Sequence, residues 1–190
     1  TREPHCLGEL LLLDAVGELP GKIAAVISNH DTLRQLVERF EVPFHFLPHH
    51  EQSRESHEHQ LAKLIDIYAP EVIVLARYMR VLSDHFVDRY SEKLINIHHS
   101  FLPAFVGAAP YQQAFERGVK VIGATAHYVT AELDAGPIIA QDVIPVDHNF
   151  SAKQMAQAGR DVEKIVLAKA VRLVLEDRVF MHGCRTVVFS

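Results

Sequence analysis

The sequence predicts an α/β protein built on an open, mixed and mainly parallel sheet with helices on both faces. Segments with the apolar runs of buried strands alternate with segments of helical periodicity. Residues 71–76 form a nearly unbroken apolar run, which is typical of a central parallel strand covered on both sides. Residues 120–129 and 137–146 read as two strands that pair as a hairpin, so the sheet becomes mixed in the second half of the chain.

The elements expected along the chain follow from apolar spacing and from the Gly, Pro and Ser residues that bound them. Helices are predicted at 7–16, 33–40, 61–69, 83–90, 110–118 and 151–176, the last beginning at a serine cap. Strands are predicted at 22–27, 43–47, 71–76 and 94–97, before the hairpin, and a small closing hairpin is predicted at 178–189. No linker or repeat interrupts this order, which indicates one domain.

Composition narrows the class of protein. The 190 residues are 48% hydrophobic and 23% charged, which fits one globular domain with a full core. A net charge of −5 without a Lys/Arg run argues against a nucleic-acid partner, and no apolar run approaches the roughly 20 residues of a membrane span. The two cysteines, Cys6 and Cys184, lie at opposite ends of the chain, and the first residues have no signal-peptide character. Both features predict a cytoplasmic protein.

Two polar side chains end the predicted strand at 94–97. Asn96 and His98 are two residues apart, so their side chains leave the strand on the same side. In an open parallel sheet, ligands bind at the carboxyl ends of the strands. On spacing alone, a polar strand end with two hydrogen-bonded side chains explains this pattern better than a functional site does.

Motifs in two parts of the chain favour the functional interpretation. Asn96-Ile97-His98, Ser100-Phe101-Leu102-Pro103 and Asp134-Ala135-Gly136-Pro137 together resemble the folate-dependent formyltransferase family. The match is closer to its hydrolytic, deformylase branch, through the phrases at residues 26–30, 76–79, 97–105, 123–128 and 159–164. The resemblance covers nearly the whole chain, so it implies a formyltransferase-like, Rossmann-like fold.

The resemblance also implies what the domain lacks and what it does. Residues 1–190 would be a catalytic domain, from which the first strand of the family fold and any N-terminal ACT domain are absent, because a helical pattern comes first. The implied activity is hydrolysis of 10-formyltetrahydrofolate to formate and tetrahydrofolate. The implied partner is a small-molecule folate substrate, with tetrahydrofolate as the one-carbon carrier rather than a separate cofactor, and a homo-oligomer is expected.

Three residues suit this chemistry. A formamide resists attack because its nitrogen lone pair is delocalised, so an enzyme must stabilise an oxyanion and protonate the leaving nitrogen. The Asn96 amide can donate to the oxyanion, His98 can move a proton at neutral pH, and the Asp134 carboxylate can favour the charged imidazole. By resemblance these are the catalytic residues, and the substrate-binding residues are Met79, Arg80, Val81, Leu82, Thr125 and His127.

Other interpretations of these residues stay open. Asp134 could be an ordinary turn residue, and His127 could be a hydrogen-bonded core histidine. His99 is expected to point away from His98. The chain departs from the deformylase pattern at Ala109 and Gln112, where a larger polar or basic residue and a histidine are expected, which puts substrate affinity or water positioning in question.

Other functions are less well supported. The sequence contains neither the GxGxxG motif of dinucleotide sites nor the HExxH motif of zinc sites. No cofactor or metal is therefore expected, although the chain has 13 histidines. Formyl transfer to an amine such as glycinamide ribonucleotide is the alternative activity. It would need a phosphate-binding glycine loop after the first strand, and the chain opens on Arg2-Glu3-Pro4-His5-Cys6 without one. A non-catalytic folate-binding module is the third alternative.

Overall fold

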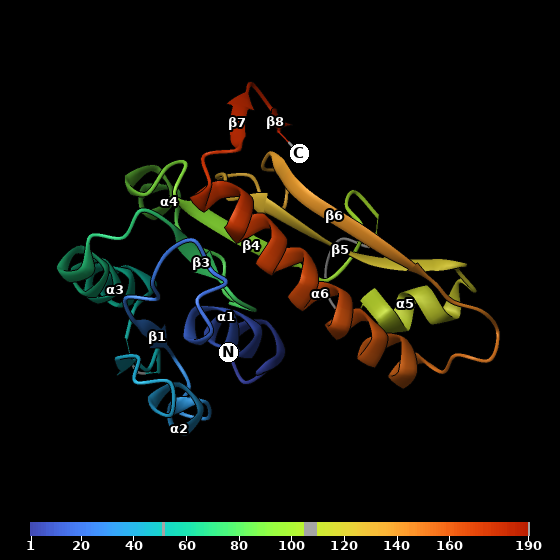
Figure 1. The fold of residues 1–190 in the computed structure, drawn as a ribbon, viewed down its shortest axis with the longest axis horizontal. Helices are drawn as coiled ribbons and strands as arrows, with labels where there is room; N and C mark the ends of the chain where they lie inside the picture. The colour runs from blue at the N-terminus through green and yellow to red at the C-terminus, as the bar shows by residue number, and fades with distance from the viewer. Residues whose placement is uncertain (51, 105–109, 190) are drawn as a thin grey trace.

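The computed structural model describes residues 1–50, 52–104 and 110–189. Helices and strands alternate through the first half of the chain, and long elements fill the second half (Figure 1). The helices are α1 (His5–Ala15), α2 (Arg34–Glu38), α3 (Arg54–Tyr68), α4 (Asp84–Arg89), α5 (Pro110–Glu116) and α6 (Ala152–Leu175). The strands are β1 (Val26–Ser28), β2 (Phe44–Phe46), β3 (Ile73–Leu75), β4 (Leu94–His98), β5 (Val121–Tyr128), β6 (Ile138–Pro145), β7 (Val179–His182) and β8 (Arg185–Val188).

The strands form one central sheet and two smaller pairs. The central sheet has the order β3-β4-β5-β6, in which β3 and β4 are parallel while β5 is antiparallel to both β4 and β6. Strands β1 and β2 form a separate parallel pair, and β7 and β8 form the predicted closing hairpin. The predicted α/β fold with a mixed sheet is confirmed, with its parallel pairs confined to the first half of the chain.

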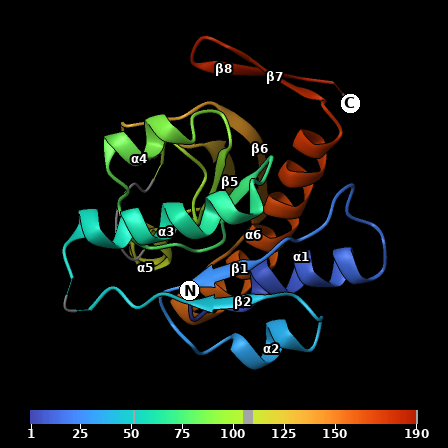
Figure 2. The same ribbon diagram turned by 90° about the vertical axis from the view of Figure 1, so that its left-hand side faces the viewer.

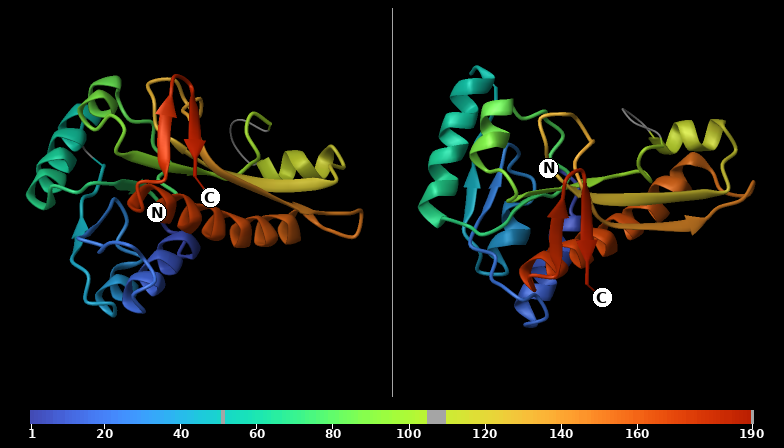
Figure 3. Two further views of the ribbon diagram at one scale, coloured as in Figure 1. Left: turned by 45° about the horizontal axis from the view of Figure 1, so that its top comes forward. Right: turned by 90° about the horizontal axis from the view of Figure 1, so that it is seen from above.

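Helices cover both faces of the central sheet. Ile95 and Ile97 of β4 pack into the core formed with α1 and α6, whereas Leu94 packs on the other face with residues of α3 and α4. Figure 3 (left) shows α1 and α6 beneath the sheet and α4 above it, and Figure 2 shows β1 and β2 side by side next to α1. None of the helices among the described residues is long and apolar enough to cross a membrane.

Helix α6 is the longest element, and its ends are as predicted. The Ser151 hydroxyl accepts from the backbone N–H of Gln154, whose side chain accepts from the Ser151 N–H, so a capping box starts the helix. The predicted buried face is correct at Val162 and Val166, but Ile165 is 55% exposed. A single residue of rotation on a helix accounts for this error, because neighbouring positions lie about 100° apart.

The predictions differ most from the structure around β1 and β3. The predicted strand at 22–27 begins only at Val26, and β3 is half-buried rather than covered on both sides. An apolar cavity of about 490 Å³ lies between the segments that contain these two strands, and Val26, Ile27, Val74 and Leu75 line it. Strand β3 therefore has packed neighbours on fewer sides than its sequence predicts.

Candidate functional site

The site lies where β4 ends. Residues 95 and 97 face α6, so Asn96 and His98 project from the opposite face, on the same side as predicted. Leu75 of β3 pairs with Asn96, so the parallel strands β3 and β4 end at the same edge of the sheet. His98 is only 5% exposed at this edge.

Asp134 reaches this strand end from the loop between β5 and β6. Its Oδ2 lies 3.2 Å from Nδ1 of His98. Asp134 adopts a left-handed backbone conformation with φ of 55°, which aspartate tolerates better than most residues. The other ring nitrogen of His98, Nε2, is buried and has no hydrogen-bond partner among the described residues. His98 therefore has one nitrogen paired to a carboxylate and one available for a reactant.

Gly136 fixes the path of the loop that carries Asp134. A Cβ at this position would lie 1.8 Å from the carbonyl oxygen of Tyr128 and 3.4 Å from Nδ1 of His127. No side chain fits in that space, so only glycine allows the loop to pack this closely on β5. The Asp-Ala-Gly-Pro phrase is thus more than a turn, because the glycine places the aspartate.

His127 connects the site to β5. Its Nδ1–H donates to the carbonyl oxygen of Tyr128 at 2.8 Å, and its Nε2 lies 3.4 Å from Nδ2 of Asn96. Burial lowers the pKa of His127 below its ordinary value, against opposing contributions from the Tyr128 hydrogen bond and Asp134, so the ring is neutral at neutral pH. A neutral ring with its proton on Nδ1 accepts from the Asn96 amide through Nε2. His127 is therefore a hydrogen-bonded core histidine that also orients Asn96.

Thr125 has no capacity left for a ligand. Its side chain is fully buried, and its hydroxyl donates to the carbonyl oxygen of Ser100 at 2.9 Å. The hydroxyl oxygen of Thr125 also accepts from the N–H of Leu102 at 3.0 Å and from the Gln141 amide at 2.9 Å. One donor and two lone pairs are all that a hydroxyl offers. Through these hydrogen bonds Thr125 holds the turn after His98 against β5.

The segment 79–82, expected to bind substrate, leaves β3 at the same edge. Met79 is 72% exposed and Val81 is 58% exposed, whereas Leu82 is buried with Phe86 in the core below. Residues 80–82 take part in none of the backbone hydrogen bonds found among the described residues. Their N–H and C=O groups are therefore free to bond a heterocycle that carries its own donors and acceptors.

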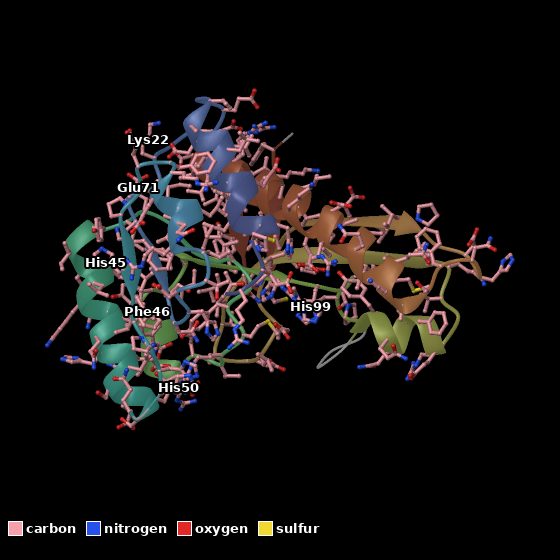
Figure 4. The ribbon with its side chains drawn as sticks, turned by 90° about the horizontal axis from the view of Figure 1, so that it is seen from below. Lys22, His45, Phe46, His50, Glu71 and His99 are labelled. Carbon is pink, nitrogen blue, oxygen red and sulfur yellow. The ribbon has the colours of Figure 1, made fainter. Side chains whose placement is uncertain are left out.

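His99 differs from the prediction. Its ring does not point away from His98 but stacks on it, with centroids 5.1 Å apart and planes inclined by 28°. Pairing of β4 with β5 ends at His98, opposite Thr125, so strand alternation no longer governs residue 99. In Figure 4, His99 lies on the α5 side of the molecule, whereas His45 and His50 lie beside α3.

A buried polar cluster centred on Glu163 has no counterpart in the predicted site. Glu163 of α6 is completely buried, and its carboxylate accepts from the Tyr111 hydroxyl at 2.7 Å and contacts Nε2 of His5 at 2.8 Å. Arg77, which has a left-handed φ of 59°, brings its Nε to 3.6 Å from the same carboxylate. The sequence could have drawn attention to Glu163, because this charged residue interrupts the apolar stripe that contains Val162 and Val166.

Three potential metal ligands belong to this cluster. His5, Cys6 and Glu163 place donor atoms within 4.8 Å of one another. The Glu163 carboxylate is already bonded to Tyr111 and His5, and the Arg77 guanidinium beside it disfavours a second cation. Burial, with the Glu163 charge, also raises the pKa of the Cys6 thiol, which opposes the thiolate that a metal needs. The charges therefore favour an ion-pair cluster over a metal site.

The departure from the deformylase pattern can be followed at one of its two positions. Gln112 is exposed on α5, and its amide donates to Glu116 at 2.7 Å. Ala109 lies outside the described residues. Gln112 is thus directed along its own helix and not toward His98 or Asp134.

Comparisons with known proteins agree with one another. The family described as formyl transferase matches residues 1–171. Formyltetrahydrofolate deformylase of Escherichia coli O6:H1 is 60% identical over 188 residues, which are 99% of this chain and 67% of the relative. The crystal structure of a formyltetrahydrofolate deformylase from Pseudomonas syringae pv. tomato has a TM-score of 0.96 and 51% identity, and covers 100% of this chain.

Similarity to proteins that carry a different name is weaker in sequence. A glycinamide ribonucleotide transformylase 1 from Symbiobacterium toebii has a TM-score of 0.93 and 31% identity, with 98% of this chain and 89% of that chain covered. The chain spans 67% of the Escherichia coli relative and 63% of the Pseudomonas syringae structure. The chain therefore corresponds to about two thirds of the length of these two deformylases.

Proposed function

Because this chain belongs to the formyl transferase family, we propose that it hydrolyses 10-formyltetrahydrofolate to formate and tetrahydrofolate. The observation that carries this proposal is the His98–Asp134 pair at the end of β4, next to the amide of Asn96. Identity to the two deformylases is 60% and 51%, against 31% to the transformylase. Water is therefore favoured over an amine as the acceptor.

The His98–Asp134 pair supplies the proton that the leaving nitrogen needs. The Asp134 carboxylate at Nδ1 stabilises a charged His98 imidazole, and Nε2 then carries the proton toward the substrate. When the water oxygen has bonded to the formyl carbon, the C–N bond breaks and the nitrogen takes this proton. One proton of the water restores His98, and the second is released as formic acid ionises to formate, so atoms and charge balance.

Asn96 supplies the hydrogen bond to the oxyanion. One hydrogen of its amide is directed to Nε2 of His127, which fixes the amide plane, and the second hydrogen can be donated to the formyl oxygen. Because the donor is oriented before the reaction, little reorganisation is needed as negative charge develops. His127 thus acts on the reaction through Asn96.

The folate would lie over the strand ends, with its pterin ring on residues 80–82. The support for this placement is the unpaired backbone of these residues, which leave β3 at the edge where Asn96 and His98 stand. Val81 is exposed beside this backbone and offers apolar area to a flat ring. Replacing Val81 by Asp is expected to weaken folate binding with less effect on the rate of the bound complex.

Formate release tests the proposed activity. The protein is incubated with 10-formyltetrahydrofolate, with and without glycinamide ribonucleotide, and formate and the formylated amine are measured separately. Formate in both reactions, without formylated amine, is the expected result. Formylated amine as the main product would instead assign the protein to formyl transfer, and binding without turnover would make it a folate-binding module.

We also propose a cytoplasmic location and a homo-oligomeric state. Cys6 and Cys184 are free thiols, as in proteins of reducing compartments. Phe180 and Phe189 of the closing hairpin are 55% and 57% exposed and lie against each other, which offers apolar area for a second copy. Light scattering tests this association, and a monomer at all concentrations would contradict it.

A further inference from the structure

The proposed hydrolysis leaves one task without a residue. Asn96 stabilises the oxyanion, His98 protonates the nitrogen, and Asp134 is occupied by its contact with His98. The attacking water also has to be held with a lone pair directed at the formyl carbon, because alignment of the reacting atoms accounts for much of an enzyme's rate. A group that accepts a hydrogen from this water would provide that alignment.

His99 is a polar side chain in direct contact with His98 that has no role in the steps above. Its ring stacks on that of His98, and the residue is only 9% exposed. Among the described residues, its ring contacts are with His98 and Tyr111, and no protein group there hydrogen-bonds to its nitrogens. A buried imidazole without protein partners normally bonds to water or to a ligand. The stack places this ring next to that of His98, whose Nε2 is also without a partner among the described residues.

The ring of His99 is held from behind by Tyr111. The two ring centroids are 6.2 Å apart, and the Tyr111 hydroxyl is bonded to the buried Glu163. Gly159 of α6 makes room for Tyr111, since a Cβ there would lie 2.0 Å from the tyrosine hydroxyl oxygen. This support fixes the orientation of His99, which a residue that aligns a reactant requires.

The charge state of His99 also suits an acceptor. Burial lowers the pKa of His99 to about 4, and the Arg77 guanidinium contributes in the same direction. The ring is therefore neutral at pH 7, so one of its nitrogens carries a lone pair. A charged ring would have two donors and no acceptor.

We propose that His99 orients the attacking water by accepting one of its hydrogens, a role that rests on the proposed hydrolysis. His99 holds a hydrogen bond and takes no net proton. The water oxygen forms the C–O bond and the C–N bond breaks, with the protons transferred through His98 and to solvent as described above. His99 thus positions the water, whereas Asn96 and His98 act on the formamide.

The test separates attack by water from attack by another nucleophile. His99→Phe keeps a flat ring for the stack on His98 but removes the acceptor. Formate release is expected to fall about 10²-fold, the scale of a misaligned reactant, while folate affinity and formyl transfer to added hydroxylamine are retained. His99→Gln, whose side-chain oxygen can accept a hydrogen bond, should recover part of the formate release.

Controls keep the outcomes distinct. His59→Phe, on the exposed side of α3, is the matched histidine substitution and should behave as the parent, and thermal melts establish that each variant is folded. Equal loss of formate and of formylated hydroxylamine in His99→Phe or His99→Gln would mean that His99 only supports His98, which overturns the proposal. Unchanged formate release would also overturn it. A parent protein that releases no formate would remove the proposed function itself.

Discussion

The Nδ1 atom of His98 lies 3.2 Å from Oδ2 of Asp134, and the two side chains come from a strand end and a loop that meet only in the folded protein. His98→Ala and Asp134→Asn should each abolish most formate release while folate affinity changes little. Both groups act on charge that develops in the transition state, so their loss affects the rate more than ground-state binding. Single-turnover formate release and folate titration measure the two effects.

The double variant His98→Ala/Asp134→Asn tests whether the pair acts as a unit. Asp134 acts through the ionisation of His98, so the second substitution should add little to the first. If the two losses multiply, Asp134 has a role that does not pass through His98.

The contact between Asn96 and His127 leads to a second cycle of variants. Asn96→Ala should lower formate release by about 10² to 10³-fold, the usual cost of one oxyanion donor. His127→Phe should have a smaller effect, because it only frees the Asn96 amide to rotate. In the Asn96→Ala background, His127→Phe should lower formate release almost no further. If it lowers formate release there as much as it does in the parent, His127 contacts the substrate directly.

Gly136→Ala should damage the site through the backbone alone. The new Cβ would collide with the carbonyl oxygen of Tyr128, so the loop must move, and Asp134 two residues away moves with it. Overpacking of this kind costs about 1–3 kcal/mol of stability. Formate release should fall more than folate affinity.

Gly8→Ala is the matched control for this substitution. A Cβ at Gly8 meets no atom within 4 Å, and the residue lies inside α1, so alanine should raise the free energy of unfolding by about 0.5–1 kcal/mol. If Gly136→Ala behaves like Gly8→Ala in urea melts and in activity, the close approach to β5 has no functional consequence.

The pKa of His99 predicts a pH dependence of stability. The unfolded chain binds a proton at this histidine below about pH 6.5, whereas the folded chain resists binding until about pH 4. The free energy of unfolding should therefore fall as the pH drops from 6.5 to 4, with a maximal contribution from His99 of about 3 kcal/mol at 1.36 kcal/mol per pH unit.

His99→Phe removes this contribution. Urea melts at pH 7 and pH 4 should show that the variant gains stability relative to the parent on acidification. His127 contributes in the same direction in both proteins, because burial also lowers its pKa, so the variant keeps part of the dependence. The same pH slope in parent and variant would mean that the folded protein binds a proton at His99 as readily as the unfolded chain.

The sequence allowed most of the fold to be predicted because its elements have local causes. The cap at Ser151, the serine before α4 and the apolar alternation around Asn96 each act within a few residues. The convergence of Asn96 and His98 followed from strand geometry. The approach of Asp134 came from the resemblance and not from any local pattern, because a loop's path depends on contacts such as that of Gly136 with Tyr128.

The cluster at Glu163 could not be predicted by the same reasoning. Its members come from α1, the end of β3, α5 and α6, and they are brought together only by packing of these helices on the sheet. His99 was misplaced because strand alternation was extended one residue beyond the last paired position. Thr125 was predicted to bind substrate, but its hydroxyl bonds to Ser100, Leu102 and Gln141, and these contacts depend on the turn after His98, which no local pattern predicts.

The apolar cavity between the segments of β1 and β3 has a consequence for how the protein behaves in solution. Among the described residues, β1 pairs only with β2 and β3 only with β4, so each strand offers one row of unused backbone donors and acceptors. Exposed strand edges of this kind template pairing with other chains. The protein should therefore self-associate through these edges as its concentration rises, and a short extended apolar peptide that bridges β1 and β3 should suppress that association.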